Sequence, residues 1–140
     1  MAAKDFTLFS VYAGWAPTKK LAKASSTVIR PWTMVALSSG LAIEATAASA
    51  AIAYCEHWAA AGSTELLVIN DPNAEYIGTA DANFAVTQRA TEVDLVVNSG
   101  VQEIDVGASS TDVFKVSMGT DAGTVGSEEN VKVKINKFIY

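Results

Sequence analysis

The sequence has one cysteine, Cys55, and one histidine, His57, among 140 residues. A single cysteine excludes an intrachain disulfide, so packing, hydrogen bonds or oligomerisation must stabilise the fold. A zinc site needs three or four converging ligands, which carboxylates would have to complete here. We interpret Cys55 as a small buried hydrophobic residue and His57 as the start of a loop. A metal site or a small hydrolase that uses Cys55, Glu56 and His57 is the remote alternative.

Long apolar runs are also missing. The nearest approach to a membrane helix, residues 41–62, is interrupted by Glu44, Glu56 and His57 and is largely alanine, whereas a membrane helix needs about 20 apolar residues. The first residues do not resemble a signal peptide, because Asp5 stands where a positive region is expected. The sequence predicts a soluble protein that is made in a host cytoplasm and has no membrane partner.

Basic residues are few and unevenly placed. Ten basic and fifteen acidic residues give a net charge of −5, which argues against a nucleic-acid partner. Residues 1–32 hold five basic residues and one acidic residue, residues 131–140 hold three basic residues, and the part between them holds two basic and fourteen acidic residues. This pattern predicts an acidic body with a basic N-terminal arm.

Patterns typical of catalysis are absent. The carboxylate pairs 92/94 and 103/105 lie two apart on predicted strands, and we interpret them, like the pair 128/129, as parts of a solvent-facing surface. Residues 119–126 resemble a phosphate-binding loop but lack its GK[ST] ending and precede a predicted strand. We therefore predict no enzyme activity and no cofactor.

Short β-prone segments separated by turn residues make up most of the chain. We expect strands at residues 33–37, 41–45, 51–55, 65–70, 75–79, 92–97, 101–106, 112–118 and 131–135. In residues 131–135, Val131, Val133 and Ile135 alternate with polar residues, which indicates a strand with one solvent-exposed face. Residues 98–100 predict a three-residue hairpin loop, and residues 81–84 a helical turn. A helix over residues 45–61 is the alternative, because alanine favours helices.

The pattern predicts an all-β fold, a small sandwich or barrel-like domain over residues 28–140, preceded by an extended N-terminal arm over residues 1–27. The arm is too aromatic to be a free tail, so we expect it to lie on its own body, on a neighbouring subunit or on another protein. We expect the body to fold without it. The tryptophans fit interface contacts or the domain's own core, and stacking on sugars is a weaker option. The candidate interaction residues are Phe6, Phe9, Tyr12, Trp15, Lys19, Lys20, Arg30, Trp32 and Trp58.

Two stretches carry a family resemblance. The positions that match in residues 28–56 are Pro31, Thr33, Val35, Gly40, Leu41, Ala45, Thr46, Ala50, Ala51 and Ile52. With residues 78–116, they cover about half the chain and resemble the head decoration, or cement, proteins of tailed bacteriophages. Trp32 departs from the pattern, because a glycine is expected before the threonine.

The resemblance implies a β-tulip or β-sandwich protein that binds the outer surface of an assembled capsid and stabilises it without catalysis. It implies the major capsid protein as partner, a homotrimer, and an arm that adds a strand to a neighbour. The expected location is the virion surface. The alternative is another virion part, such as a tail-tube, head-fibre or adsorption protein.

Overall fold

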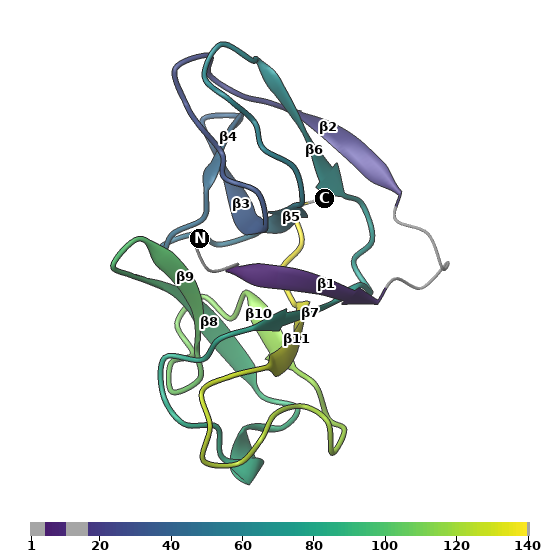
Figure 1. The fold of residues 1–140 in the computed structure, drawn as a ribbon, viewed down its shortest axis with the longest axis vertical. Coiled ribbons are helices and arrows are strands. Elements are labelled where there is room, and N and C mark those ends of the chain that lie inside the picture. The colour runs from purple at the N-terminus through teal and green to yellow at the C-terminus, as the bar shows by residue number, and fades with distance from the viewer. Residues whose placement is uncertain (1–4, 11–16, 140) are drawn as a thin grey trace.

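β-Strands dominate the computed structural model, which describes residues 5–10 and 17–139 (Figure 1). The strands are β1 (Phe6–Ser10), β2 (Thr18–Ala22), β3 (Thr33–Ser38), β4 (Leu41–Glu44), β5 (Ala53–Cys55), β6 (Glu65–Ile69), β7 (Glu75–Gly78), β8 (Glu92–Asn98), β9 (Val101–Asp105), β10 (Phe114–Val116) and β11 (Val131–Ile135). Within these ranges the only helical element is the short 3-10 turn η1 (Val86–Gln88). The predicted all-β fold is confirmed, and the helix considered for residues 45–61 does not form. No helix among the described residues is long and apolar enough to cross a membrane.

A six-stranded antiparallel sheet forms the lower half of the molecule in Figure 1, in the order β1-β7-β11-β10-β8-β9. Its last strand returns to the segment that follows β7. The Ile104 N–H donates to the Thr79 carbonyl oxygen at 2.8 Å, and the Asp81 N–H donates to the Ile104 carbonyl oxygen at 2.9 Å. These bonds close the sheet, so we call residues 5–10 and 71–139 the barrel.

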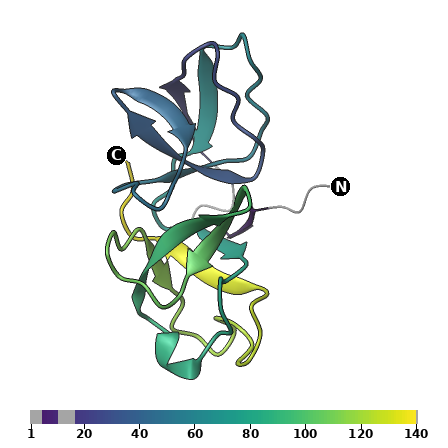
Figure 2. The same cartoon turned by 90° about the vertical axis from the view of Figure 1, so that its left-hand side faces the viewer.

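Two smaller sheets form the upper half, which we call the apical lobe (residues 17–70). β4, β3 and β5 form one sheet, and β2 and β6 form the other. Figure 2 shows the lobe stacked on the barrel. The chain's end returns to the lobe, where Phe138 pairs with Ile52 in a parallel bridge.

The sheet of β3, β4 and β5 is a middle layer. On β3, Met34 and Ala36 pack into the barrel's core, whereas Val35 between them packs into the lobe's smaller core. A strand covered on both faces needs apolar residues without alternation. This explains the continuous apolar run at residues 34–36, all of which are buried.

The described parts of the N-terminal segment are strands of the body. β1 pairs with β7, β2 pairs with β6, and the Phe6 side chain is 0% exposed. Of the three supports expected for the arm, these parts lie on the chain's own body, and the folding of residues 28–140 without them stays a prediction. Tyr12 and Trp15 lie outside the described residues.

Three local predictions need correction. The hairpin between β8 and β9 has a two-residue loop, because Asn98 pairs with Val101. Ser99 and Gly100 have φ values of 51° and 79°, which is the left-handed geometry that matches the twist of paired strands. The solvent-exposed face predicted for the last strand is wrong at Lys132, which is buried with its ammonium group against the Phe9 ring and Asp121, whereas Lys134 on the same face is exposed. The helical turn forms at η1, after residues 81–84.

Candidate functional site

Arg30 is held inside a polar seam between the lobe and the barrel. Its Nη2 lies 2.9 Å from Asp5 Oδ2 and 3.0 Å from Glu44 Oε1, and its backbone N–H donates to Glu44 Oε2 at 2.8 Å. Burial raises the pKa of Asp5 despite the nearby guanidinium. Arg30, a predicted interaction residue, thus has two internal partners.

Gln102 completes this seam. Its side chain, 1% exposed, accepts from the Met34 N–H at 2.7 Å and donates to the carbonyl oxygens of Met34 and Ala45 at 2.9 and 3.0 Å. Its own backbone N–H donates to Asp5 Oδ2 at 3.1 Å. A buried amide with these partners is well satisfied, and it fastens β9 of the barrel to β3 and β4 of the lobe.

Sequence reasoning missed Gln102, although a signal existed. Residues 102, 104 and 106 share one face of a strand by the two-residue period, and Ile104 and Val106 mark that face as buried. A glutamine in line with them points inward and needs hydrogen-bond partners. The carboxylates that pair with Arg30, Asp5 and Glu44, carried no such local signal, because they are distant from it in sequence.

Phe6 and Trp32 were predicted as contacts but serve the fold. The Phe6 ring lies 5.3 Å from that of Phe114, centroid to centroid, and its N–H donates to the Trp32 carbonyl oxygen at 3.0 Å. Trp32 packs partly buried against the barrel's core with a φ of 62°. This conformation favours glycine, as the resemblance expects here, and the packed indole compensates for its cost.

Phe9 lies on the surface near the end of β1. It is 50% exposed, and the Lys132 Nζ lies 3.7 Å from the centre of its ring. The same ammonium group pairs with Asp121 Oδ2 at 2.6 Å. Phe9 is therefore half available to a partner while it covers a buried lysine.

Lys19 and Lys20 lie on β2, whose only strand partner among the described residues is β6. Both lysines are exposed. A strand with an open edge presents backbone groups that can pair with another extended segment, and lysines on it discourage nonspecific pairing. Among the described residues, the second edge of β2 is therefore unpaired, and its lysines discourage nonspecific strand pairing there.

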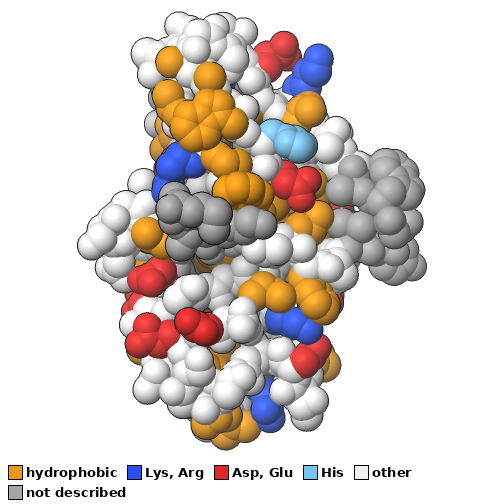
Figure 3. Space-filling model, in the orientation of Figure 1, with side chains coloured by type: hydrophobic (Ala, Val, Ile, Leu, Met, Phe, Trp, Pro, Cys, Tyr) orange, Lys and Arg blue, Asp and Glu red, His pale blue; other side chains and the backbone are white. Residues whose placement is uncertain are grey.

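Trp58 is the most exposed of the candidate aromatic residues that the structure describes. Its side chain is 60% exposed and borders a hollow of about 420 Å³. The hollow is lined by His57, Trp58, Ala59, Ala60, Ser63, Glu65, Leu66 and Leu67. Figure 3 shows that hydrophobic side chains gather on the visible face of the lobe, while acidic side chains are more frequent on that of the barrel.

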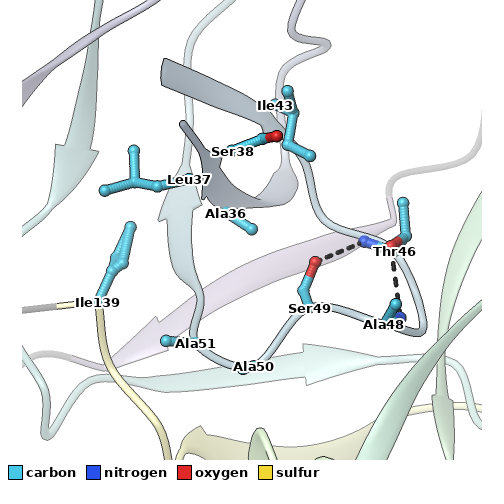
Figure 4. Close-up of a pocket in the computed structure, with 10 residues that line it drawn as sticks. All are labelled: Ala36, Leu37, Ser38, Ile43, Thr46, Ala48, Ser49, Ala50, Ala51 and Ile139. Carbon is cyan, nitrogen blue, oxygen red and sulfur yellow. Dashed lines mark hydrogen bonds between the residues drawn. The ribbon is translucent and has the colours of Figure 1, made fainter. Parts of the chain in front are cut away.

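A second hollow of about 500 Å³ lies where β3 and β4 meet the segment that follows them (Figure 4). It is lined by Ala36, Leu37, Ser38, Ile43, Thr46, Ala48, Ser49, Ala50, Ala51 and Ile139. The Thr46 N–H donates to Ser49 Oγ at 3.0 Å, and none of the lining side chains is charged. The hollow therefore has a defined shape, but its lining offers no charged side chain to a ligand.

Cys55 is buried and has no activated thiolate. Its Sγ contacts the His57 carbonyl oxygen at 3.1 Å, and burial raises the pKa of the thiol, so the neutral form is favoured. Among the described residues, no group of three or more His, Cys, Asp or Glu side chains is placed to hold a metal ion. The geometry around residues 55–57 provides no positioned nucleophile.

One predicted surface carboxylate is buried instead. Asp94 accepts backbone N–H groups of Ser110, Thr111 and Asp112 at 2.8 to 3.0 Å. Burial opposes the ionisation of Asp94, but these donors outweigh it and hold its pKa below the ordinary value. The carboxylate thus organises a loop of the barrel, which corrects the solvent-facing interpretation of residue 94.

Comparisons of the chain with protein-family models, curated proteins and solved structures find no match.

Proposed function

We propose that this chain is a virion structural protein that binds the outer surface of an assembled phage capsid and stabilises it. The observation that carries the proposal is the edge of β2 away from β6, which no strand pairs among the described residues and beside which Lys19 and Lys20 are exposed, on a body built by antiparallel strand pairing. Such an edge suits strand addition, in which backbone hydrogen bonds supply affinity and alternate side chains supply specificity. The resemblance in residues 28–56 and 78–116 points the same way.

The charge distribution supports attachment through the lobe. Residues 17–70 hold four basic and three acidic residues, whereas residues 71–139 hold five basic and eleven acidic residues. With Asp5 of residues 5–10 included, the barrel has a net charge of −7 and would repel other copies of itself on a crowded shell. The lobe, at +1, carries no such penalty and exposes Trp58 and Leu67 as apolar contacts.

The buried polar groups fit a structural role. The seam of Asp5, Arg30, Glu44 and Gln102 uses its charges and amide groups on internal partners. Binding of many copies to the assembled shell, and not to its dissociated subunits, would stabilise it by mass action. A homotrimer would add avidity, because linked copies bind with a raised effective concentration.

Co-sedimentation with purified shells of the encoding phage tests this proposal. We expect the Lys19→Glu/Lys20→Glu double variant to lose at least about tenfold in affinity, because it reverses charge beside the open edge. The matched control is Lys115→Glu/Lys134→Glu, which makes the same charge change at exposed residues of the barrel.

Equal binding by both double variants would overturn the role of β2. Labelled protein found on tails rather than heads would instead favour a tail-tube, head-fibre or adsorption protein. The Tyr12→Ser/Trp15→Ser variant tests the remaining arm candidates without removing β1 or β2, and it should weaken shell binding. Sedimentation equilibrium of the free protein checks the expected homotrimer.

A further inference from the structure

The hollow beside Trp58 combines one exposed indole with hydrogen-bonding side chains. Trp58 is 60% exposed, although so large an apolar side chain usually gains stability by burial. His57 and Glu65 are exposed and Ser63 is half-buried, and all three line the same hollow. His57, the chain's single histidine, thus shares the hollow with the apolar side chains of Trp58, Leu66 and Leu67.

The walls of this hollow are tied to the fold. Ala59, next to Trp58, forms an antiparallel β-bridge with Ile29. Each residue's N–H donates to the other's carbonyl oxygen, at 2.9 and 3.0 Å. The Ser63 N–H donates to the Ala60 carbonyl oxygen at 3.3 Å, and buried Leu66 supports the base from β6. A shape held before binding spares a ligand the cost of ordering it.

The lining groups select a class of ligand. The Glu65 carboxylate accepts hydrogen bonds, and the His57 imidazole has two ring nitrogens that can bond to a ligand. The Ser63 hydroxyl donates to the Glu65 carbonyl oxygen at 3.4 Å and can still accept from a ligand. Hydroxyl groups of a ligand, which also donate and accept, satisfy all three. No lysine or arginine is among the described residues that line the hollow, so an anionic ligand would meet Glu65 without a counter-charge.

The indole supplies the remaining selectivity. Its face is electron-rich and attracts weakly positive C–H edges. A pyranose ring with equatorial hydroxyls presents C–H groups on its flat faces and hydroxyls around its rim, which matches an aromatic wall flanked by polar groups. The volume of about 420 Å³ lies in the range of small-ligand sites.

We propose that the hollow bordered by Trp58 binds a neutral, glucose-configured saccharide, stacked on the indole and hydrogen-bonded by Glu65, His57 and Ser63. This activity is additional to capsid attachment. Because it needs no capsid, its test succeeds or fails independently of the proposed function.

The test is a titration of the full-length protein with cellotetraose and with chitotetraose, followed by NMR. We expect saturable shifts of the Trp58 indole N–H and of the backbone amides at residues 57–67, with a dissociation constant of about 1 mM. Trp58→Ala should abolish these shifts, and Trp58→Phe should weaken binding severalfold. Met118→Ala, which removes an exposed apolar side chain of the barrel, should leave binding unchanged.

Absence of saturable shifts with both saccharides at about 20 mM would overturn the proposal. Equal saccharide binding by Trp58→Ala, in a protein whose thermal unfolding is unchanged, would also overturn it. If Trp58→Ala instead loses shell binding while neither saccharide binds, the hollow is a protein-docking surface and the saccharide assignment is wrong.

Discussion

The barrel and the apical lobe bury different kinds of side chain. The barrel's core contains the rings of Phe6, Tyr54, Tyr76, Phe84 and Phe114. The lobe's separate core has no aromatic residue among its described members and includes three alanines and Cys55. Since buried area sets most of the hydrophobic contribution, we expect the barrel to be the more stable half. The lobe contributes Met34, Ile52 and Tyr54 to the barrel's core, so we expect it to depend on that contact.

This contrast assigns separate roles to the two halves. Surfaces that bind partners are usually found where local stability is low and shape is held by neighbours. The lobe has the open edge of β2 and the Trp58 hollow, while the seam at Gln102 anchors it. The barrel supplies stability and an acidic outer surface.

The largest expected effect separates Phe6 from Phe9 on the same strand. Phe6→Ala should lower the free energy of unfolding by about 3–5 kcal/mol, because it leaves a cavity next to Phe114. Phe9→Ala, the matched control, should cost less than about 1 kcal/mol, because the ring is half exposed and contacts mainly Lys132. Urea denaturation measures both, and similar costs would show that β1 does not belong to the barrel's core.

The next effect tests the anchoring of the lobe. Gln102→Leu should cost about 2–4 kcal/mol, because it removes the side-chain partner of the buried Met34 N–H and of the Ala45 carbonyl oxygen. In this variant we also expect the lobe's amides to exchange with solvent faster than those of the barrel, because the hydrogen bonds from the Gln102 side chain to the lobe are lost. Glu103→Gln, one residue along β9, is the control. Uniform exchange in Gln102→Leu would contradict the anchoring role.

The smallest effect uses pH to compare a carboxylate in each region. Asp94 has a lowered pKa in the folded barrel, so its contribution to stability is present above its ordinary value of 3.8 and is lost as the pH falls through the folded pKa. Asp5, in the seam, has a raised pKa, so stability rises as the pH falls through its folded value. NMR titration of the two carboxyl groups should place Asp94 below 3.8 and Asp5 above it.

Asp94→Asn provides the energetic counterpart. It should cost about 2 kcal/mol at pH 7, because an amide oxygen accepts the three N–H groups more weakly than a carboxylate does. The cost should shrink once the pH lies below the folded pKa of Asp94. A reversed order of the two midpoints would refute the assigned environments.

Local sequence patterns were sufficient to predict most strands and the all-β class. Alternation at residues 131, 133 and 135 and turn residues such as Ser39-Gly40 act over short distances, so they were visible without a structure. Barrel closure was not visible, because it depends on Ile104 meeting residues 79 and 81. The burial of Lys132 was missed because Phe9 and Asp121, which contact its ammonium group, lie on other segments of the chain.

The candidate site was less predictable than the fold. Trp58 and the lysines at residues 19 and 20 lie on the surface as expected, but Phe6 and Arg30 are committed to internal contacts. An aromatic or a cation has the same local appearance in a core, a seam or an interface. Only the tertiary arrangement separates these roles.

Hydrogen exchange of the protein bound to assembled shells tests the division of roles most directly. We expect shell binding to slow amide exchange at β2 and at residues 57–67 of the lobe, while amides of β8, β9 and β10 exchange as they do in the free protein. Slowed exchange confined to the barrel's outer strands, with β2 unchanged, would contradict it.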